Sequence, residues 1–148
     1  MDPAANKEVL FVKHTNSLES VLRADGLLRA GAGRDVDILG VSNDSRHVHV
    51  GDLFICKGYG FKPEYLLMAQ RAGAVCYLSE EKYDACSLPA ILISDVRKAQ
   101  SLAARWFYDC PSDSLDLIGV TGTKGKTTTA YMIQAITNAI ARRPTGLS

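Results

Sequence analysis

A glycine-rich segment near the C-terminal end of the chain, Leu117–Thr128 (LIGVTGTKGKTT), constrains the fold more than any other feature. The apolar residues of Leu115–Thr121 predict a buried strand, and those of Lys126–Ala141 recur at the spacing of a helix. Glycines between the two allow a tight turn, at which backbone N–H groups converge near the positive end of the helix. This order predicts an α/β sheet with an anion-binding site at the carboxyl end of a strand.

The lysine and threonines after the glycines add the chemistry of a nucleotide site. A lysine at this place supplies charge to the β- and γ-phosphates, and the next residue supplies a hydroxyl to a magnesium ion, here Thr127. Val120 stands where the strict G-x-x-x-x-G-K-[ST] pattern has glycine, and a strand-to-helix turn without a ligand is the alternative explanation. The expected nucleotide-binding residues are Gly122, Thr123, Lys124, Gly125, Lys126, Thr127 and Thr128.

Strands and helices alternate along the preceding residues, which places the chain in the α/β class. Apolar residues at helical spacing predict three further helices, Thr15–Arg23, Glu64–Ala72 and Val96–Tyr108. Short apolar runs predict strands at Asp37–Ser42, Leu53–Cys56, Ala74–Leu78 and Ala90–Ser94. Gly73 is the expected C-cap of the second helix, and Asp95 the N-cap of the third.

The polar break at Cys110–Asp116 predicts a boundary between two domains. Residues 1–111 would form a small N-terminal α/β domain with a mixed sheet. Residues 112–148 would form the first strand, phosphate loop and helix of a truncated central ATPase domain. Because only 20 residues follow Thr128, we expect the front portion of a larger enzyme, with no catalytic residue inside it.

Composition excludes several other classes of protein. Seventeen basic and 16 acidic residues give a net charge of +1, which argues against a surface that binds nucleic acid. No apolar run is long enough for a membrane span, and the N-terminus lacks the pattern of a signal peptide, so we expect a cytoplasmic protein. The four cysteines show no C-x-x-C spacing, which argues against a metal or disulfide framework.

Two motifs carry a resemblance to a known family. The loop GVTGTKGKTT with its following helix resembles the ATP loop of the Mur ligases, which build the peptide of bacterial peptidoglycan. Asp44-Ser45-Arg46, then Val48, then Gly51-Asp52-Leu53-Phe54 is similar to the signature D-S-R-x-V-x-x-G-D-L-F in the N-terminal domain of the ligase that adds the third residue. The two motifs are independent, and they keep the family's order.

The resemblance implies an ATP-dependent ligase with Mg²⁺. One substrate would be a UDP-N-acetylmuramoyl-dipeptide, UDP-N-acetylmuramoyl-L-Ala-D-Glu. The other would be a diamino acid, either L-lysine or meso-diaminopimelate. ATP would convert the terminal carboxylate into an acyl phosphate, which the amine of the diamino acid then attacks. Lys124 and the pair Phe61-Lys62 are similar to the lysine-adding branch of the family.

The resemblance also implies where the substrate binds. Asn43 and Ser45 should face the uridine, and the loop Tyr59-Gly60-Phe61 should lie near the diphosphate and the uracil. The loop, GYGFKPEY, is shorter than in many members and lacks their Asp-Gly pair. Asp44 and Arg46 have a plainer alternative, in which they pair with each other or cap the turn.

The incomplete ATP domain implies that the chain alone ligates nothing and binds ATP weakly. In the full-length enzyme we expect a monomer. In the isolated chain, the last helix has an apolar face, Ile133, Ile136 and Ile140. Three alternatives follow: the helix is disordered, it packs back on the first domain, or it is exchanged with another copy in a swapped oligomer.

Three alternative functions stay open at this point. A kinase or GTPase would share the phosphate loop but needs no D-S-R/G-D-L-F motif upstream. A stand-alone UDP-sugar-binding module would need no ATP. Folylpolyglutamate synthase shares the loop type but begins with it.

Overall fold

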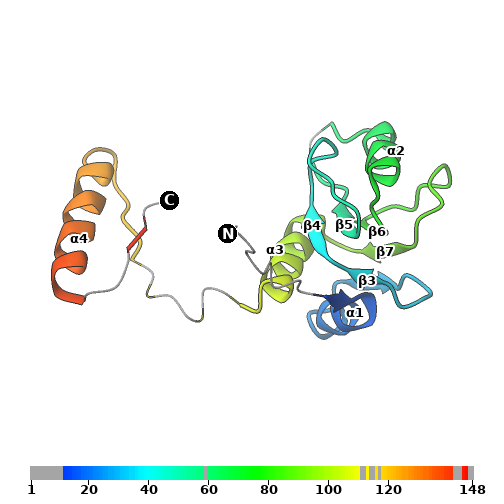
Figure 1. Ribbon diagram of the computed structural model, residues 1–148, viewed down its shortest axis with the longest axis horizontal. Helices are drawn as coiled ribbons and strands as arrows, with labels where there is room; N and C mark the ends of the chain where they lie inside the picture. The colour runs from blue at the N-terminus through cyan, green and yellow to red at the C-terminus, as the bar shows by residue number, and fades with distance from the viewer. Residues whose placement is uncertain are drawn as a thin grey trace, which may run out of the picture. The chain divides into compact units, whose positions relative to one another are not determined.

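The computed structural model describes residues 12–58, 60–110, 113, 116, 118–141 and 145–146. The chain divides into two units. The first unit is Met1–Pro111 and the second is Ser112–Ser148 (Figure 1). All strands assigned to described residues belong to the first unit.

A mixed five-stranded sheet, in the order β2-β7-β6-β5-β4, forms the centre of the first unit. Its parallel strands are β4 (Gly40–Ser42), β5 (Asp52–Ile55), β6 (Cys76–Ser79) and β7 (Ala90–Ile93). Strand β2 (Leu28–Ala30) pairs antiparallel with β7. Strand β4 therefore lies at one edge of the sheet, with the turn to β5 at its carboxyl end.

The predicted strand Asp37–Ser42 is divided in two. Strand β3 (Asp37–Ile38) pairs antiparallel with β1 (Lys13–His14) in a separate two-stranded sheet, whereas β4 joins the main sheet. Between them, the backbone N–H of Leu39 donates to Gly51 O at 2.9 Å. This hydrogen bond ties the chain to the turn before β5 at the point where it passes from one sheet to the other.

Helices cover both faces of the main sheet (Figure 1). Helices α1 (Thr15–Ala24) and α3 (Val96–Phe107) bury apolar side chains with Leu53, Ile55 and Leu78. Helix α2 (Pro63–Ala72) packs on the opposite face, against Phe54 and Tyr77. Because side chains alternate along a strand, successive residues of β5 and β6 pack into the hydrophobic cores on opposite faces of the sheet.

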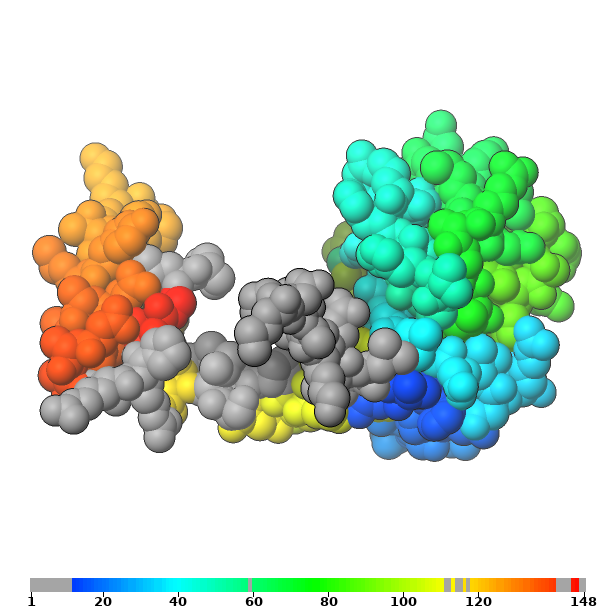
Figure 2. Space-filling model, in the orientation of Figure 1, coloured from blue at the N-terminus to red at the C-terminus, as the bar shows by residue number. Residues whose placement is uncertain are grey.

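Two predicted caps are present. The Asp95 carboxylate accepts hydrogen bonds from the backbone N–H groups of Arg97 (2.9 Å) and Lys98 (3.1 Å) and so begins α3. Gly73 ends α2 in a left-handed conformation with φ of 107°. A Cβ at Gly73 would lie 2.9 Å from Val50 Cα, so a side chain there would collide with the turn between β4 and β5. Figure 2 shows that turn, in cyan, beside α2, in green.

The second unit contributes helix α4 (Lys126–Ala141), as predicted. The predicted strand Leu115–Thr121 is not formed in its described part, since Asp116 and residues 118–121 carry no strand assignment. A parallel strand needs neighbours to take its backbone hydrogen bonds, and none of the described residues offers them. Among the described residues, no helix has the length and hydropathy that a membrane span requires.

Candidate functional site

The turn of residues 43–51 follows the carboxyl end of β4, where open α/β sheets bind ligands. Its first part is closed by Asp44, whose Oδ1 accepts from Arg46 N (3.0 Å) and Nε (2.9 Å) and whose Oδ2 accepts from Arg46 Nη2 (2.6 Å). The hydrogen bonds from Arg46 hold the pKa of the Asp44 carboxyl well below its ordinary value. Asp44 and Arg46 thus pair with each other and stabilise the turn.

The last part of the turn is held by a buried carboxylate. Asp52 is only 6% exposed, and its Oδ2 accepts from the backbone N–H of His49 at 2.8 Å. A Cβ at Gly40 would lie 2.2 Å from Asp52 Oδ1. Glycine at position 40 therefore leaves the room in which Asp52 reaches the turn, and both ends of the turn are fixed by carboxylates.

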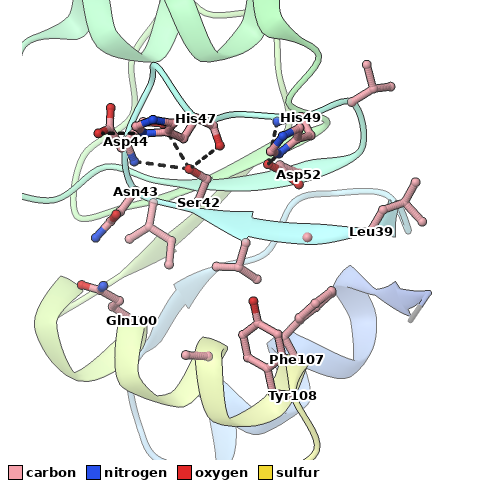
Figure 3. Close-up of a pocket in the computed structure, with 15 residues that line it drawn as sticks. Leu39, Ser42, Asn43, Asp44, His47, His49, Asp52, Gln100, Phe107 and Tyr108 are labelled. Carbon is pink, nitrogen blue, oxygen red and sulfur yellow. Dashed lines mark hydrogen bonds and ion pairs between the residues drawn. The ribbon is translucent and has the colours of Figure 1, made fainter. Parts of the chain in front are cut away.

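A cleft of about 1080 Å³ runs along the open edge of β4 (Figure 3). Asn43 and Ser42 line it from the turn and the strand, and Ala104 and Phe107 line it from α3. Ser45 follows two residues later in the same turn but does not line the cleft. The Ser42 hydroxyl is already hydrogen-bonded within the turn: Ser42 Oγ donates to Asp44 O (3.1 Å) and accepts from Asp44 N (3.3 Å).

Gln100 is a lining residue that sequence reasoning missed. It lies on α3, and Figure 3 shows its amide at the same end of the cleft as the amide of Asn43. Its Oε1 is buried and has no hydrogen-bond partner within the described part of the chain. Only the arrangement of α3 against the edge of β4 brings residues 43 and 100 together, so no local pattern could have identified Gln100.

The second predicted substrate loop follows β5, at the same carboxyl end of the parallel strands as the turn. Tyr59 lies outside the described residues. Gly60 adopts a left-handed conformation with φ of 94°. The ring of Phe61 packs beside three aromatic rings. Its centroid lies 6.5 Å from that of Phe54, 6.1 Å from that of Tyr65 and 5.7 Å from that of Tyr83. Phe61 therefore anchors this loop on the core beneath α2, and neither Gly60 nor Phe61 lines the cleft.

The phosphate loop in the second unit has the backbone that its glycines allow. Gly122 and Gly125 have φ of 154° and 78°, and α4 begins directly at Lys126. Lys126 Nζ donates to Gly122 O at 2.6 Å, so the ammonium group lies across the loop. Residues 122–128 are all exposed. Together the N-terminal N–H groups of α4 and this ammonium give the exposed loop a positive polarity.

No family model matches the chain. It is 41% identical over 125 residues, 82% of its length, to a UDP-N-acetylmuramyl-tripeptide synthetase of Lactobacillus delbrueckii subsp. bulgaricus. It is 40% identical over 111 residues to a UDP-N-acetylmuramoyl-L-alanyl-D-glutamate--L-lysine ligase of Enterococcus faecalis. The chain belongs to the Mur ligase family. It spans about a quarter of these relatives, 24% and 22% of their lengths.

Solved structures of Mur ligases share the fold of this chain. MurF from Acinetobacter baumannii superposes with a TM-score of 0.63 at 23% identity, over 88% of this chain and 28% of that one. A UDP-N-acetylmuramoylalanyl-D-glutamyl-2,6-diaminopimelate--D-alanyl-D-alanyl ligase from the same organism gives 0.60 at 21% identity. At such low identity the likeness shows the fold alone.

Proposed function

We propose that this Mur ligase chain is the N-terminal portion of an ATP-dependent ligase of peptidoglycan synthesis. The enzyme would act in the cytoplasm and add L-lysine or meso-diaminopimelate to UDP-N-acetylmuramoyl-L-Ala-D-Glu, a step on which cell shape and division depend. The observation that carries this proposal is the 41% identity to a tripeptide synthetase over 82% of the chain.

In this proposal the first unit, residues 1–111, binds the UDP end of the substrate. Asn43 lines the cleft at the edge of β4, and Ser45 lies in the turn that Asp44 and Asp52 hold closed. Short polar side chains at a strand end can hydrogen-bond a uracil edge. The loop Tyr59-Gly60-Phe61 follows the neighbouring parallel strand, which supports its assignment to the same ligand.

The second unit, residues 112–148, would begin the ATP-binding domain. Its exposed loop fits a nucleotide: left-handed glycines permit the curvature, and the N–H groups of Thr127 and Thr128 lie at the positive end of α4. Lys126 would contact the β- and γ-phosphates, and the Thr127 hydroxyl would hold Mg²⁺, which neutralises phosphate charge when bound. The described residues contain no group of three or more His, Cys, Asp or Glu side chains suited to a metal.

The proposed reaction has two steps. The terminal carboxylate of the dipeptide attacks the γ-phosphorus of ATP, which gives an acyl phosphate and ADP. The amine of the diamino acid then attacks the acyl carbon, and inorganic phosphate leaves as the amide bond forms. The first unit would contribute by holding the UDP end, so that the distant carboxylate is positioned for phosphorylation. The isolated chain is proposed to catalyse neither step.

Calorimetry with the 148-residue chain tests this proposal. UDP-N-acetylmuramoyl-L-Ala-D-Glu and ATP would be titrated separately into the wild type, Ser45→Ala and Lys126→Ala. We expect the UDP ligand to bind, with about tenfold loss in Ser45→Ala and no change in Lys126→Ala. ATP should bind weakly, and Lys126→Ala should reduce that binding further.

Each failure in this experiment has a distinct meaning. If the wild type does not bind the UDP ligand, the substrate assigned to the first unit is wrong. If the UDP ligand binds but ATP binding is insensitive to Lys126→Ala, a UDP-sugar-binding module without ligase function becomes the better account. A kinase or GTPase is disfavoured because the curated relatives are ligases.

A further inference from the structure

Gln100 presents an unusual combination of position and bonding. It belongs to α3, whose inward positions Ala99, Ala103 and Phe107 are buried and apolar. Beside them, Gln100 is half-buried and lines the cleft along β4. Its Oε1 is shielded from solvent without a hydrogen-bond partner among the described residues. A buried carbonyl oxygen without a donor destabilises the fold, and an apolar side chain of similar size would avoid that cost.

The surroundings of Gln100 indicate what its amide can meet. Asn43, on the turn after β4, brings a second amide to the same end of the cleft (Figure 3). Val41 and Ala104 also line the cleft, and their side chains offer no hydrogen bonds. The charged Asp44 carboxylate already interacts with the side chains of Arg46 and His47. Asn43 and Gln100 thus bring two neutral amides to this end of the cleft.

A neutral ring with adjacent donors and acceptors matches two amides. The imide edge of uracil presents one N–H donor, at N3, between the acceptors O2 and O4. A primary amide offers one acceptor and two donors in a plane, so it can pair with N3–H and a neighbouring carbonyl at once. The terminal torsion of glutamine is soft, so an incoming base can turn the amide of Gln100 toward itself.

We infer that Gln100 is a specificity-determining residue that pairs with the imide edge of uracil at the end of the cleft shared with Asn43. This inference rests on the proposed function, because it deepens the assignment of the UDP end of the substrate to the first unit. The unsatisfied oxygen in the free chain is then an acceptor kept for the base. Uracil binding supplies the hydrogen bond that Oε1 of Gln100 lacks in the free chain.

The test combines binding with thermal stability in the 148-residue chain. Gln100→Leu replaces the amide by an apolar side chain of similar size. UDP and CDP would be titrated by calorimetry, and the melting temperature measured without ligand. We expect Gln100→Leu to weaken UDP binding by about tenfold or more and to reduce the preference for UDP over CDP. Its melting temperature should rise, because an unsatisfied buried oxygen is removed.

Gln70→Leu is the matched control in the same unit. Gln70 is also half-buried, but its amide is paired, since Nε2 donates to Ser87 Oγ at 2.8 Å and Oε1 accepts from Cys86 Sγ at 3.1 Å. We expect Gln70→Leu to lower the melting temperature and leave the affinity for UDP unchanged. The control therefore shows the signature of a structural glutamine.

Three results would overturn the inference. Unchanged UDP affinity in Gln100→Leu would show that Gln100 does not meet the base, while the proposed function would stand. A fall in melting temperature with unchanged nucleotide preference would assign Gln100 a structural role. Failure of the wild type to bind UDP would remove both this inference and the substrate proposed for the first unit.

Discussion

Asp44 holds the first half of the turn 43–51 closed through its paired contact with Arg46. Its lowered pKa means that the ionised form is favoured in the folded state. The contribution of this carboxylate to stability is therefore complete above the ordinary pKa of about 3.9 and is lost only as the pH falls through the lower folded value. We predict that a carboxyl NMR titration finds Asp44 below its ordinary pKa, and that Arg46→Met moves it upward. An unchanged titration in Arg46→Met would contradict the pairing.

The cysteines allow a second prediction about single residues. Burial raises the pKa of Cys56 and of Cys76 to about 12, so both remain thiols at pH 8 and are shielded from reagents. Cys86 is buried as well, whereas Cys110 is half-buried. We predict that iodoacetamide labels Cys110 first in the native chain and all four cysteines after denaturation. Peptide mass spectrometry measures this, and early labelling of Cys76 would show that the core is open.

The candidate site was only partly predictable from single residues. Asn43 and Ser45 belong to a motif of contiguous residues, which can be recognised without a structure. Gln100 belongs to no such motif, because a lone glutamine on an amphipathic helix has the same pattern as a solvent-facing one. The packing of Phe61 also depends on distant aromatic rings, of Tyr65 and Tyr83, which the sequence of the loop does not specify.

At the scale of elements, the end of α2 and the turn before β5 are locked together. Gly73 O accepts from Gly51 N at 2.9 Å, and a Cβ at Gly73 would strike the backbone of Val50. We predict that Gly73→Ala lowers the free energy of unfolding by about 2 kcal/mol or more, from left-handed strain plus collision. Urea denaturation followed by the fluorescence of Trp106 measures this.

Gly26 provides the control for Gly73. It is also left-handed, with φ of 68°, but a Cβ there meets nothing within 4 Å. We expect Gly26→Ala to cost only the backbone strain, about 1 kcal/mol. Equal losses for the two variants would show that α2 and the turn are not in close contact.

Elements with a local signal were predicted well, and those that depend on partners were not. The caps at Gly73 and Asp95 follow from residue chemistry, and both are present. Strands β1 and β2 contain only two and three residues, too few for an alternating pattern to show. The predicted strand Leu115–Thr121 has the right apolar residues, but a strand also needs neighbours for its hydrogen bonds.

At the scale of the whole molecule, α4 leaves large apolar side chains uncovered. Ile136 and Ile140 are 58% and 77% exposed, and contiguous apolar surface of this kind favours association. We predict that the molar mass of the 148-residue chain from light scattering rises with concentration. The double variant Ile136→Lys, Ile140→Lys should remain monomeric, whereas Ala139→Lys, which adds charge on the same helix, should still associate. A constant monomer mass in the wild type would contradict the prediction.

We propose that the loop before α4 serves ATP in a ligase whose substrate is held by the first unit. The most direct test fuses the chain to the downstream part of its Lactobacillus relative. Phosphate release would then be measured with ATP, UDP-N-acetylmuramoyl-L-Ala-D-Glu and either L-lysine or meso-diaminopimelate. We predict turnover with one diamino acid, and a loss of about a hundredfold or more in Lys126→Ala, with binding of the UDP substrate retained. Full turnover by Lys126→Ala would contradict the account.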